Sequence, residues 1–324
     1  MRAAEWWEHK LVPILAVFYG TSLLLGVAVG SLWRAALVVL LSLAPGAMFV
    51  SVINDVTDRD DDRAAGKVNR TEGRSRGFVA MLIALPVAAG LLFMWLWRDD
   101  ALLVSFYLAA WIAFSLYSIP PFRFKTRGIL GVLCDASGAH LFPTLVAVLL
   151  AFREARRPPE AAWLIAVAVW AFCYGLRGIL WHQLSDREHD RGAGVRTFAE
   201  RHDPAVAMRL GTFVAFPLEL AALGALLWQM RSLWPVAFLC VYAIVAVRKV
   251  RLWQMNAVIV EPRPRYFMLM NEYYLAYLPL ALLLASALQH PRDAFAVVAH
   301  VALFPAGVLL ALAQLPVLRP FQKR

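Results

Sequence analysis

Long apolar stretches alternate with short polar segments along almost the whole chain of 324 residues. Each stretch is about 20 residues long, the length that an α-helix needs to cross the hydrocarbon core of a bilayer. The pattern therefore predicts an all-α, polytopic transmembrane helix bundle with nine or ten spans. The ten stretches cover about 11–31, 33–53, 78–97, 101–118, 129–152, 161–184, 205–229, 233–250, 266–289 and 294–318.

The composition agrees with this pattern. Hydrophobic residues make up 61% of the chain, charged residues only 17%, and the mean hydropathy is +0.62. Soluble domains average about 45–50% apolar and about 25% charged residues. A soluble globular protein is therefore excluded, and no polar region outside the apolar stretches is long enough for a second domain. We expect a single transmembrane domain over residues 1–324.

Lysine and arginine are distributed unevenly between the polar segments. Most of the 32 basic residues lie after the second, fourth, sixth and eighth stretches and at the two ends. Because basic segments stay on the cytoplasmic side, we expect those segments and both termini in the cytoplasm, in a multi-pass protein of the cell inner membrane. The net charge of +10 fits contact with anionic lipid heads. No basic stripe stands on a soluble module, so membrane lipids are expected partners and nucleic acid is not.

Two of the polar segments repeat one another. Residues 54–62 read Asn-Asp-Val-Thr-Asp-Arg-Asp-Asp-Asp, and residues 182–190 read His-Gln-Leu-Ser-Asp-Arg-Glu-His-Asp. One segment ends the second apolar stretch and the other ends the sixth. A shift of 128 residues aligns Asp58 with Asp186, Arg59 with Arg187, Asp62 with Asp190, Arg63 with Arg191, Ala65 with Ala193 and Gly66 with Gly194.

A charged repeat at matching spans is typical of two parallel halves that face one cavity. We expect the first half over about 11–118, with the first aspartate motif at 54–62. We expect the second half over about 129–250, with the second aspartate motif at 186–190, and extra helices over 266–318. The sequence therefore predicts two pseudo-repeated halves around a central cavity.

The aspartates lie at helical spacing. If the first motif continues the preceding helix, Asn54, Asp58 and Asp62 occupy positions i, i+4 and i+8 and share one face. Asp186 and Asp190 share a face in the same way. Carboxylates this close together need a cation between them, and hard oxygen ligands suit Mg²⁺, which commonly bridges carboxylates and substrate phosphates. Two facing clusters are therefore expected to hold a diphosphate through Mg²⁺, for which Mn²⁺ can substitute.

Basic side chains near both motifs favour the same ligand. Guanidinium and ammonium groups form strong charge-assisted hydrogen bonds to phosphate oxygens. The residues that could neutralise the diphosphate in this way are Lys67, Arg70, Arg123, Lys125 and Arg196.

Three simpler interpretations of the motifs compete with this one. A run of charges at a helix end is usually a solvated face, although the second copy argues against this for residues 58–63. A calcium loop would need glycine where Arg63 stands and a bidentate glutamate where Asn69 stands. A structural metal ion that joins two helices is the third interpretation.

The three charged regions resemble, in order, those of a known family. The first aspartate motif resembles that of the UbiA family of intramembrane prenyltransferases, as Asn54-Asp55-x-x-Asp58-x-x-x-Asp62. The second resembles the family's second motif, through Asp186-x-x-x-Asp190, Gly194 and Arg196-Thr197. The loop after the fourth stretch resembles the family's loop at that place, through Tyr117-Ser118, Pro120-Pro121, Arg123, Lys125 and Gly128. The resemblance covers about residues 30–200, and beyond about 205 it rests on apolar helices alone.

The resemblance implies a helical bundle, usually of nine spans, around a cavity that opens to the lipid. It also implies that an allylic diphosphate ionises at Mg²⁺ and then alkylates an acceptor. By the same resemblance the five basic residues named above contact the diphosphate, and Tyr117 lies near the ionising carbon. The implied metal ligands are Asn54, Asp55, Asp58, Asp62, Asp186 and Asp190.

Three features depart from the family's pattern. His182 and Gln183 stand where many members have an acidic pair, so the second motif carries less charge. The chain has one apolar stretch more than usual, after the seventh. Residues 71–76 read Thr-Glu-Gly-Arg-Ser-Arg, where an Arg-Pro pair is frequent.

One carboxylate lies inside an apolar stretch. Ionisable residues within a membrane span are functional candidates by default, because burying them is costly. Asp135 is therefore expected to orient or deprotonate the acceptor, and the alternative is a structural pairing with Arg177 or Arg127. The candidate catalytic residues are thus Asp58, Asp62, Asp186, Asp190, Tyr117 and Asp135.

Together these features predict a prenyltransferase that moves a prenyl group from a prenyl diphosphate to an acceptor within the membrane. A UbiA-type terpene cyclase would use the same metal site without an acceptor. A membrane carrier coupled to ion transport is the alternative without catalysis. The acceptor and the length of the prenyl chain depend on the shape of the cavity, on which these motifs carry no information.

Overall fold

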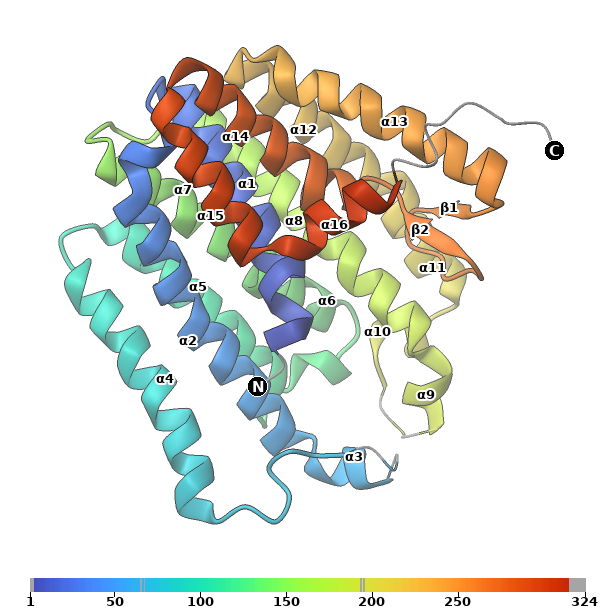
Figure 1. Ribbon diagram of the computed structural model, residues 1–324. Coiled ribbons are helices and arrows are strands. Elements are labelled where there is room, and N and C mark those ends of the chain that lie inside the picture. Colours follow the sequence, from blue (N-terminus) through green and yellow to red (C-terminus); the bar gives the residue numbers. More distant parts are fainter. Residues whose placement is uncertain (1–2, 65, 67, 193, 195, 315–324) are drawn as a thin grey trace.

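The computed structural model describes residues 3–64, 66, 68–192, 194 and 196–314, and most of them are helical (Figure 1). The longer α-helices are α1 (Ala3–Leu25), α2 (Trp33–Thr57), α4 (Arg76–Leu96), α5 (Ala101–Ser118), α7 (Phe142–Glu154), α8 (Ala161–Ser185), α12 (Phe216–Met230), α13 (Leu233–Trp253) and α14 (Leu278–Gln289). The shorter ones are α3 (Arg59–Ala64), α6 (Ile129–Ala136), α9 (Arg187–Gly192), α10 (Phe198–Arg201), α11 (Pro204–Arg209), α15 (Ala294–Leu303) and α16 (Pro305–Gln314). The expected all-α class is confirmed, with one short parallel pair of strands, β1 (Asn256–Val258) and β2 (Tyr266–Met268).

Short helical turns of other types connect or interrupt these helices. The 3₁₀ turns are η1 (Val29–Leu32), η2 (Phe124–Thr126) and η6 (Pro291–Asp293). The π-turns are η3 (Ser137–Leu141), η4 (Leu210–Ala215) and η5 (Tyr273–Tyr277). A π-turn inside a helix widens it locally without ending it. Helical spans therefore continue through η3 over Ile129–Glu154 and through η4 over Pro204–Met230.

Seven of the described helical segments are long and apolar enough to cross a membrane, and the bent pair α15–α16 brings the number to eight. The protein is therefore polytopic as expected, but this number is below the expected nine or ten. The ninth expected span is shorter than predicted, because β2 and a loop occupy its start and leave only Tyr273–Gln289 as an apolar helix. α1 also lies outside the seven.

The tenth expected span is broken. α15 and α16 meet at 88°, and Phe304 between them has φ −134° and ψ 63°, outside the helical region. Pro305 follows directly, and the ring of a proline disfavours the helical conformation of the residue before it. The break is therefore a local consequence of Pro305, which hydropathy does not register.

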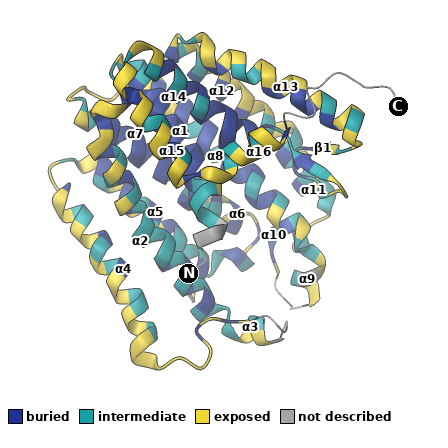
Figure 2. Ribbon diagram, viewed as in Figure 1, coloured by how far each residue is buried: buried dark blue, intermediate teal, exposed yellow. Residues whose placement is uncertain are grey.

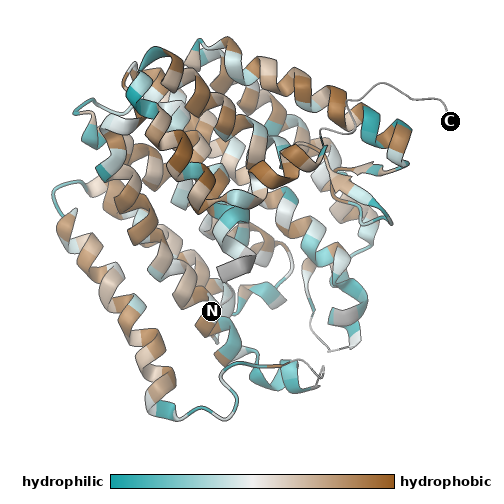
Figure 3. Cartoon of the chain, viewed as in Figure 1, coloured by the Kyte–Doolittle hydropathy of each residue, from teal (hydrophilic) through white to brown (hydrophobic). Residues whose placement is uncertain are grey.

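The centre of the bundle is formed by α1 and α7, which pack against each other. Residues 11–22 of α1 and Pro143–Phe152 of α7 are buried without interruption. Helices that are apolar on every side suit such a position. α4 lies at the edge instead (Figure 2), with Leu85, Leu91 and Trp95 exposed. Figure 3 shows that α4 is largely hydrophobic, as expected of a helix whose outer surface faces lipid.

Both aspartate motifs lie at the same end of the bundle. The short helix α3 follows α2, α9 follows α8, and both short helices are at the lower end in Figure 1. α2 packs against α4, and α8 packs against α12. The two helices that lead into the motifs thus have equivalent neighbours, whereas the repeat of whole halves stays a prediction.

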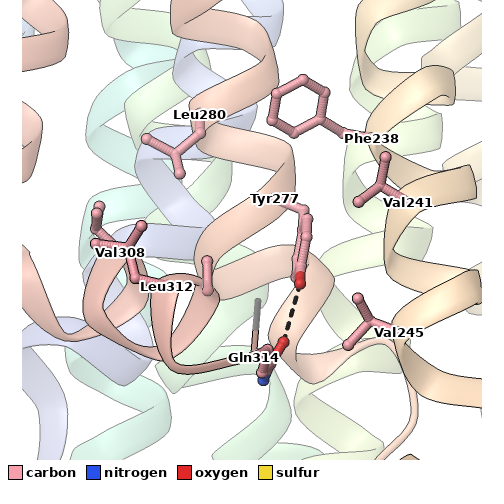
Figure 4. A pocket seen from close by; sticks show the side chains of 9 residues that line it. Phe238, Val241, Val245, Tyr277, Leu280, Val308, Leu312 and Gln314 are labelled. Carbon is pink, nitrogen blue, oxygen red and sulfur yellow. Dashed lines mark hydrogen bonds between the residues drawn. The ribbon is translucent and has the colours of Figure 1, made fainter. Parts of the chain in front are cut away.

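Two cavities lie away from the motifs. The first, of about 240 Å³, lies between α13, α14 and α16. Figure 4 shows the Tyr277 hydroxyl pointing toward Gln314 among apolar side chains, and the hydroxyl donates to Gln314 Oε1 (2.9 Å). The second, of about 900 Å³, is lined by the start of α2 and by α15, at the opposite end from α3. Neither is lined by the motifs, so the central cavity between them also stays a prediction.

Candidate active site

The first aspartate motif lies at a bend between two helices. α2 ends at Thr57, Asp58 has φ −102° and ψ 6°, and α3 begins at Arg59. Helical hydrogen bonds continue across the bend, because the Asp58 N–H donates to the Asn54 carbonyl (2.9 Å) and the Asp62 N–H to the Asp58 carbonyl (2.7 Å). The motif thus differs from the continuous helix expected, but it keeps the i, i+4, i+8 spacing of its three ligand candidates.

The acidic side chains of the first motif differ in exposure. The Asp60 side chain is 96% exposed, whereas those of Asp58 and Asp61 are 23% and 34% exposed. Asp55 is buried. Asp60 therefore points into solvent, and the candidate metal ligands Asp55 and Asp58 lie inside.

Two cations from the loop after α5 contact the first motif. Arg123 Nη2 donates to Asp61 (2.5 Å) and to Asp58 (3.1 Å), and Lys125 Nζ forms an ion pair with the same Asp58 carboxylate. Burial lowers the pKa of Lys125, and the charge of Asp58 opposes this only in part. Burial also acts against the charged form of Arg123, but hydrogen bonds to Asp61 and Asp58 prevail and raise its pKa. Two of the five residues expected at the diphosphate thus lie beside the motif.

Asn69 and Thr71 hold the first motif from another side. Asn69 Nδ2 donates to the Asp62 carboxylate (2.8 Å) and to the Asp55 carbonyl (2.6 Å). Asn69 Oδ1 accepts from the Thr71 N–H (3.0 Å) and from the Thr71 hydroxyl (2.7 Å). A buried polar network in which each group has a partner restricts its members to one arrangement. This network therefore fixes the direction of the Asp62 side chain.

The second aspartate motif has the same backbone geometry. α8 ends at Ser185, α9 begins at Arg187, and Asp186 lies at the bend between them. The Asp186 N–H donates to the His182 carbonyl (3.0 Å), and the Asp190 N–H donates to the Asp186 carbonyl (2.8 Å). Both bonds lie 128 residues from their counterparts in the first motif (Asp58 to Asp186).

Three kinds of side-chain contact also repeat between residues 54–72, the first motif segment, and residues 182–200, the second motif segment. In each segment an amide or hydroxyl donates to the last aspartate of the motif. One arginine donates to a residue that follows the motif, and a second arginine pairs with a glutamate. The contacts are Asn69–Asp62 (2.8 Å) and Thr197–Asp190 (3.2 Å), Arg59–Thr71 (3.1 Å) and Arg187–Ala199 (2.9 Å), and Arg63–Glu72 (2.8 Å) and Arg191–Glu200 (4.0 Å).

The sequence alignment of the two motifs stops at Gly66 and Gly194 and misses these supporting residues. Continued at the same shift, it aligns Glu72 with Glu200, which is a readable signal for the repeated Arg–Glu pair. It also aligns Asn69 with Thr197, two residue types whose shared role is evident only from their contacts. The supporting side chains were therefore only partly predictable.

The second motif segment presents less charge than the first. Gln183 stands where the first segment has Asp55, and its Oε1 accepts from the Ala199 N–H (3.3 Å). His182 lies 3.7 Å from the Asp186 carboxylate, and both side chains are well exposed. The expectation of a less charged second motif agrees with these contacts.

Tyr117 lies in the last turn of α5 and is half-buried. The residue after it, Ser118, contacts the first motif through Asn54. Asp135 of α6 is half-buried as well, and α6 packs against α5. These two candidates thus lie on neighbouring helices, and their roles in the reaction stay predictions.

Hydrogen bonds also reach the end of α5 and the loop after it. The hydroxyl of Ser118, the last residue of α5, donates to Asn54 Oδ1. Arg201, directly after the second segment, donates to the Thr126 carbonyl (2.7 Å) in the loop that carries Arg123 and Lys125. This part of the chain therefore contacts the first segment and the residue that follows the second.

The remaining basic candidates lie on the motif segments themselves. Arg70 and Arg196 are exposed, one on each motif segment. Lys67 lies outside the described residues. The contacts of Arg123 and Lys125 with Asp58 come instead from the loop after α5.

Arg177 has a partner that the sequence analysis did not identify. Its guanidinium donates twice to Glu219 of α12, at 2.8 and 2.9 Å, and both side chains are fully buried. The Tyr274 hydroxyl also donates to Glu219 (2.9 Å). The alternative pairing of Arg177 with Asp135 is therefore wrong, because the packing of α8 against α12 brings a closer carboxylate to the arginine.

The donor set of the two segments fits Mg²⁺. The side-chain donors of the candidate ligands Asn54, Asp55, Asp58, Asp62, Asp186 and Asp190 include a hard oxygen in every case. Within the described ranges, no three acidic, histidine or cysteine side chains converge on one point. Mg²⁺ is usually bound by one or two carboxylates together with substrate phosphates, rather than by an all-protein cage. Sparse ligands on each segment therefore suit a site that a diphosphate completes.

The chain is thus a polytopic helical bundle with two matched acidic segments at one end and with cations beside the first of them. The UbiA prenyltransferase family matches the chain over residues 11–271, and the chain belongs to this family. The expected family and the expected class of enzyme, a membrane prenyltransferase, are confirmed at this level.

Several characterised relatives are similar over part of their length. A lycopene elongase/hydratase of Halobacterium salinarum is 34% identical over 200 residues, 60% of this chain and 67% of that protein. A lycopene elongase/hydratase of Haloferax volcanii is 31% identical over 62% of this chain and 64% of its own length. A chloroplastic 2-acylphloroglucinol 4-prenyltransferase of Humulus lupulus is 27% identical over 63% of this chain and 49% of its own length. No solved structure matches the chain significantly.

Proposed function

We propose that the protein transfers a prenyl group from a prenyl diphosphate to an acceptor within the membrane, with Mg²⁺ as its cofactor and Mn²⁺ as a substitute. One observation carries the proposal: two acidic segments with matching backbone hydrogen bonds lie at one end of the bundle, and the cations Arg123 and Lys125 contact Asp58 of the first. Two acidic segments with cations beside them suit a ligand with two phosphates. Membership of the UbiA prenyltransferase family supports the same reaction.

The basic residues of the site handle the charge of the diphosphate. Arg123 and Lys125 already lie against Asp58 and donate from there to phosphate oxygens, with Arg70, Arg196 and Lys67 as further donors. Bound Mg²⁺, held by the six candidate ligands, would neutralise the negative charge that grows on the diphosphate. Charge stabilisation by groups fixed in advance typically lowers a barrier by several kcal/mol.

The reaction is an alkylation through an allylic carbocation. The bond between the prenyl carbon and oxygen breaks, and both electrons leave with the diphosphate. A π bond of the acceptor supplies the electrons for the new carbon–carbon bond, after which a proton is lost. The ring of Tyr117 stabilises the cation across its face, and Asp135, on the neighbouring helix α6, accepts the proton.

We further propose an apolar isoprenoid chain as the acceptor. The two relatives named lycopene elongase/hydratase are 34% and 31% identical to this chain, whereas the relative that prenylates an acylphloroglucinol is 27% identical. The distribution of Lys and Arg supports a cytoplasmic position for both motif segments.

An assay in lipid nanodiscs tests the proposal. Purified protein is incubated with Mg²⁺, isotope-labelled prenyl diphosphates of increasing length, and either lycopene or a phenolic acceptor, and products are identified by mass spectrometry. We expect a product heavier than lycopene by the labelled prenyl unit. EDTA should abolish its formation, and Mg²⁺ or Mn²⁺ should restore it.

Three other outcomes distinguish the alternatives. Alkylation of the phenol alone would support prenyl transfer but would identify a phenolic acceptor in place of an isoprenoid chain. A cyclic hydrocarbon formed without any acceptor would identify a terpene cyclase. Absence of diphosphate release under every condition would overturn the proposal and favour a carrier.

A further inference from the structure

The larger of the two cavities lies at the end of the bundle opposite the aspartate motifs. Its volume is about 900 Å³, within the range of about 300–1,000 Å³ that is usual for ligand sites. Its lining comes from two distant parts of the chain, residues 15–40 and residues 289–304. The cavity therefore exists only because the connection between α1 and α2 meets the connection between α14 and α15.

A buried carboxylate fixes the polar rim of this cavity. Asp293, 1% exposed, accepts hydrogen bonds from the Val29 N–H (2.8 Å), the Gly30 N–H (2.9 Å) and the Ser286 hydroxyl (2.5 Å). The contact requires glycine at position 30, because a Cβ there would lie 2.6 Å from Asp293 Oδ1. The rim is therefore preformed, and both oxygens of Asp293 are engaged within it.

The rim carries positive charge that Asp293 does not neutralise. Arg292 lines the cavity and is exposed. Arg34 is also exposed, next to the lining residue Trp33, with its guanidinium 5.6 Å from the centre of the Trp33 ring. Among the residues that the structure describes, neither arginine forms an ion pair. The rim thus favours an anionic ligand.

Below the rim most of the lining is apolar. Leu37 and Leu40 of α2 and Phe295 and Leu303 of α15 line the cavity. Leu37 is 45% exposed and Phe295 82% exposed, on helical segments apolar enough to lie in the membrane. An apolar wall beneath a cationic rim, at one end of a membrane bundle, matches a molecule with a hydrocarbon chain and an anionic head.

We propose that this cavity binds an anionic phospholipid, with an acyl chain between α2 and α15 and its phosphate at Arg292 and Arg34. Charge complementarity selects this ligand, because a zwitterionic phospholipid would bring a second cation to a rim that is already positive. Since the ligand contacts both distant parts of the chain, its binding stabilises their association. The site is separate from the aspartate motifs and does not depend on the proposed reaction.

Thermal unfolding of delipidated protein in a neutral detergent tests the proposal. Phosphatidylglycerol and phosphatidylcholine with identical acyl chains are titrated in parallel. We expect phosphatidylglycerol to raise Tm at concentrations about tenfold lower than phosphatidylcholine. The double variant Arg34→Gln, Arg292→Gln should need about tenfold more phosphatidylglycerol than the unmodified protein, because charge-assisted hydrogen bonds to phosphate are lost. Its response to phosphatidylcholine should be unchanged.

Arg98→Gln is the matched control. Arg98 is also an exposed arginine over an aromatic ring, 4.7 Å from the centre of the Trp95 ring, and it follows α4 outside the cavity. Its phosphatidylglycerol titration should match that of the unmodified protein. An equal loss in Arg98→Gln would show that bulk charge, and not this site, selects the lipid.

Two further results bear on the same point. Equal protection by the two lipids would overturn the proposal, and so would equal protection by soluble glycerol phosphate, which lacks the chain. Ala299→Trp places a large ring on the lining and should weaken the phosphatidylglycerol effect while the lipid-free protein still unfolds cooperatively. An unchanged titration for a cooperatively folded Ala299→Trp would exclude the cavity as the place of the acyl chain.

Discussion

The two motif segments share their hydrogen bonds but differ in charge. Around Asp58 the first segment has a buried aspartate at position 55 and two cations, Arg123 and Lys125. The second segment has Gln183 in place of Asp55, and a histidine, His182, lies beside Asp186. Backbone contacts thus determine where the aspartates lie, and the surrounding side chains determine how much charge each segment presents.

The helices behind the two segments also differ in charge, but here the charged residues lie behind the second segment. Arg177 of α8 and Glu219 of α12 form a fully buried ion pair. The shift of 128 residues leads from these positions to Phe49 of α2 and Leu91 of α4. Phe49 packs on Trp111 with ring centres 5.1 Å apart, and Leu91 is 59% exposed. α12 is therefore joined to α8 by charge, whereas α4 is held at the edge by apolar contacts.

The largest effect is expected from breaking the ion pair. Glu219→Leu leaves Arg177 charged and unpaired in a buried site, which should lower the free energy of unfolding by about 3–5 kcal/mol. Leu91→Ala, at the corresponding exposed position of α4, should change it by no more than about 0.5 kcal/mol. Denaturant unfolding in detergent, followed by circular dichroism, measures both. Equal losses would contradict the difference between α12 and α4.

Replacing the aspartates should reduce catalysis in both segments. We expect each of Asp58→Ala, Asp62→Ala, Asp186→Ala and Asp190→Ala to lower the rate of prenyl transfer at least about a hundredfold, since one electrostatic group is worth roughly 10²–10³ in rate. Single-turnover rates measure the effect, and the Tm of each variant controls for folding. If Asp186→Ala and Asp190→Ala are both silent, the first segment suffices and the repeat has no catalytic role.

The supporting side chains should matter in proportion to their contacts. Asn69→Ala loses hydrogen bonds to Asp62 and to the Asp55 carbonyl, each worth about 1 kcal/mol, so we expect a loss of about tenfold or more in rate. Thr197→Val loses one bond of 3.2 Å to Asp190 and should cost about fivefold or less. The same assay compares the two variants. A larger loss of rate for Thr197→Val than for Asn69→Ala would contradict the expectation that the losses follow the number of contacts.

The charge difference itself can be reduced by one substitution. Gln183→Asp gives the second segment the carboxylate that Asp55 supplies to the first, and it should tighten Mn²⁺ binding about threefold or more without abolishing turnover. The electron paramagnetic resonance signal of free Mn²⁺ measures the affinity. Asp55→Asn is the converse control and should weaken binding. Unchanged affinity in both variants would place positions 55 and 183 outside the metal site.

The smallest effect is expected at Asp60, whose side chain is 96% exposed. Asp60→Ala removes a solvated charge and should change the rate by less than about twofold. A loss as large as that of Asp58→Ala would mean that residues 58–62 wrap around the ion as a loop, contrary to their hydrogen bonds. The comparison needs only the rates of the two variants under identical conditions.

Much of the candidate site could be predicted from the sequence because its signal is local. Asp58 and Asp62 are four residues apart, and a spacing of four residues brings side chains together in any helix. The bend at Asp58 was not predictable, because no proline or glycine marks it. The contacts of Arg123 and Lys125 with Asp58 span 65 and 67 residues and depend on how α2 packs against α5 and the loop after it.

The sequence by itself determined that this protein is a helical membrane enzyme with two related acidic segments, because hydropathy and spacing act within one helix at a time. Tertiary structure alone decided the partner of Arg177, which lies 42 residues away at Glu219. It also decided that the Asp293 carboxylate accepts a hydrogen bond from the N–H of Gly30, 263 residues away. A buried charge takes the partner that packing brings to it, and packing depends on all the helices at once. The number of complete spans was also missed, because hydropathy measures whether a stretch is apolar and not whether its helix stays straight.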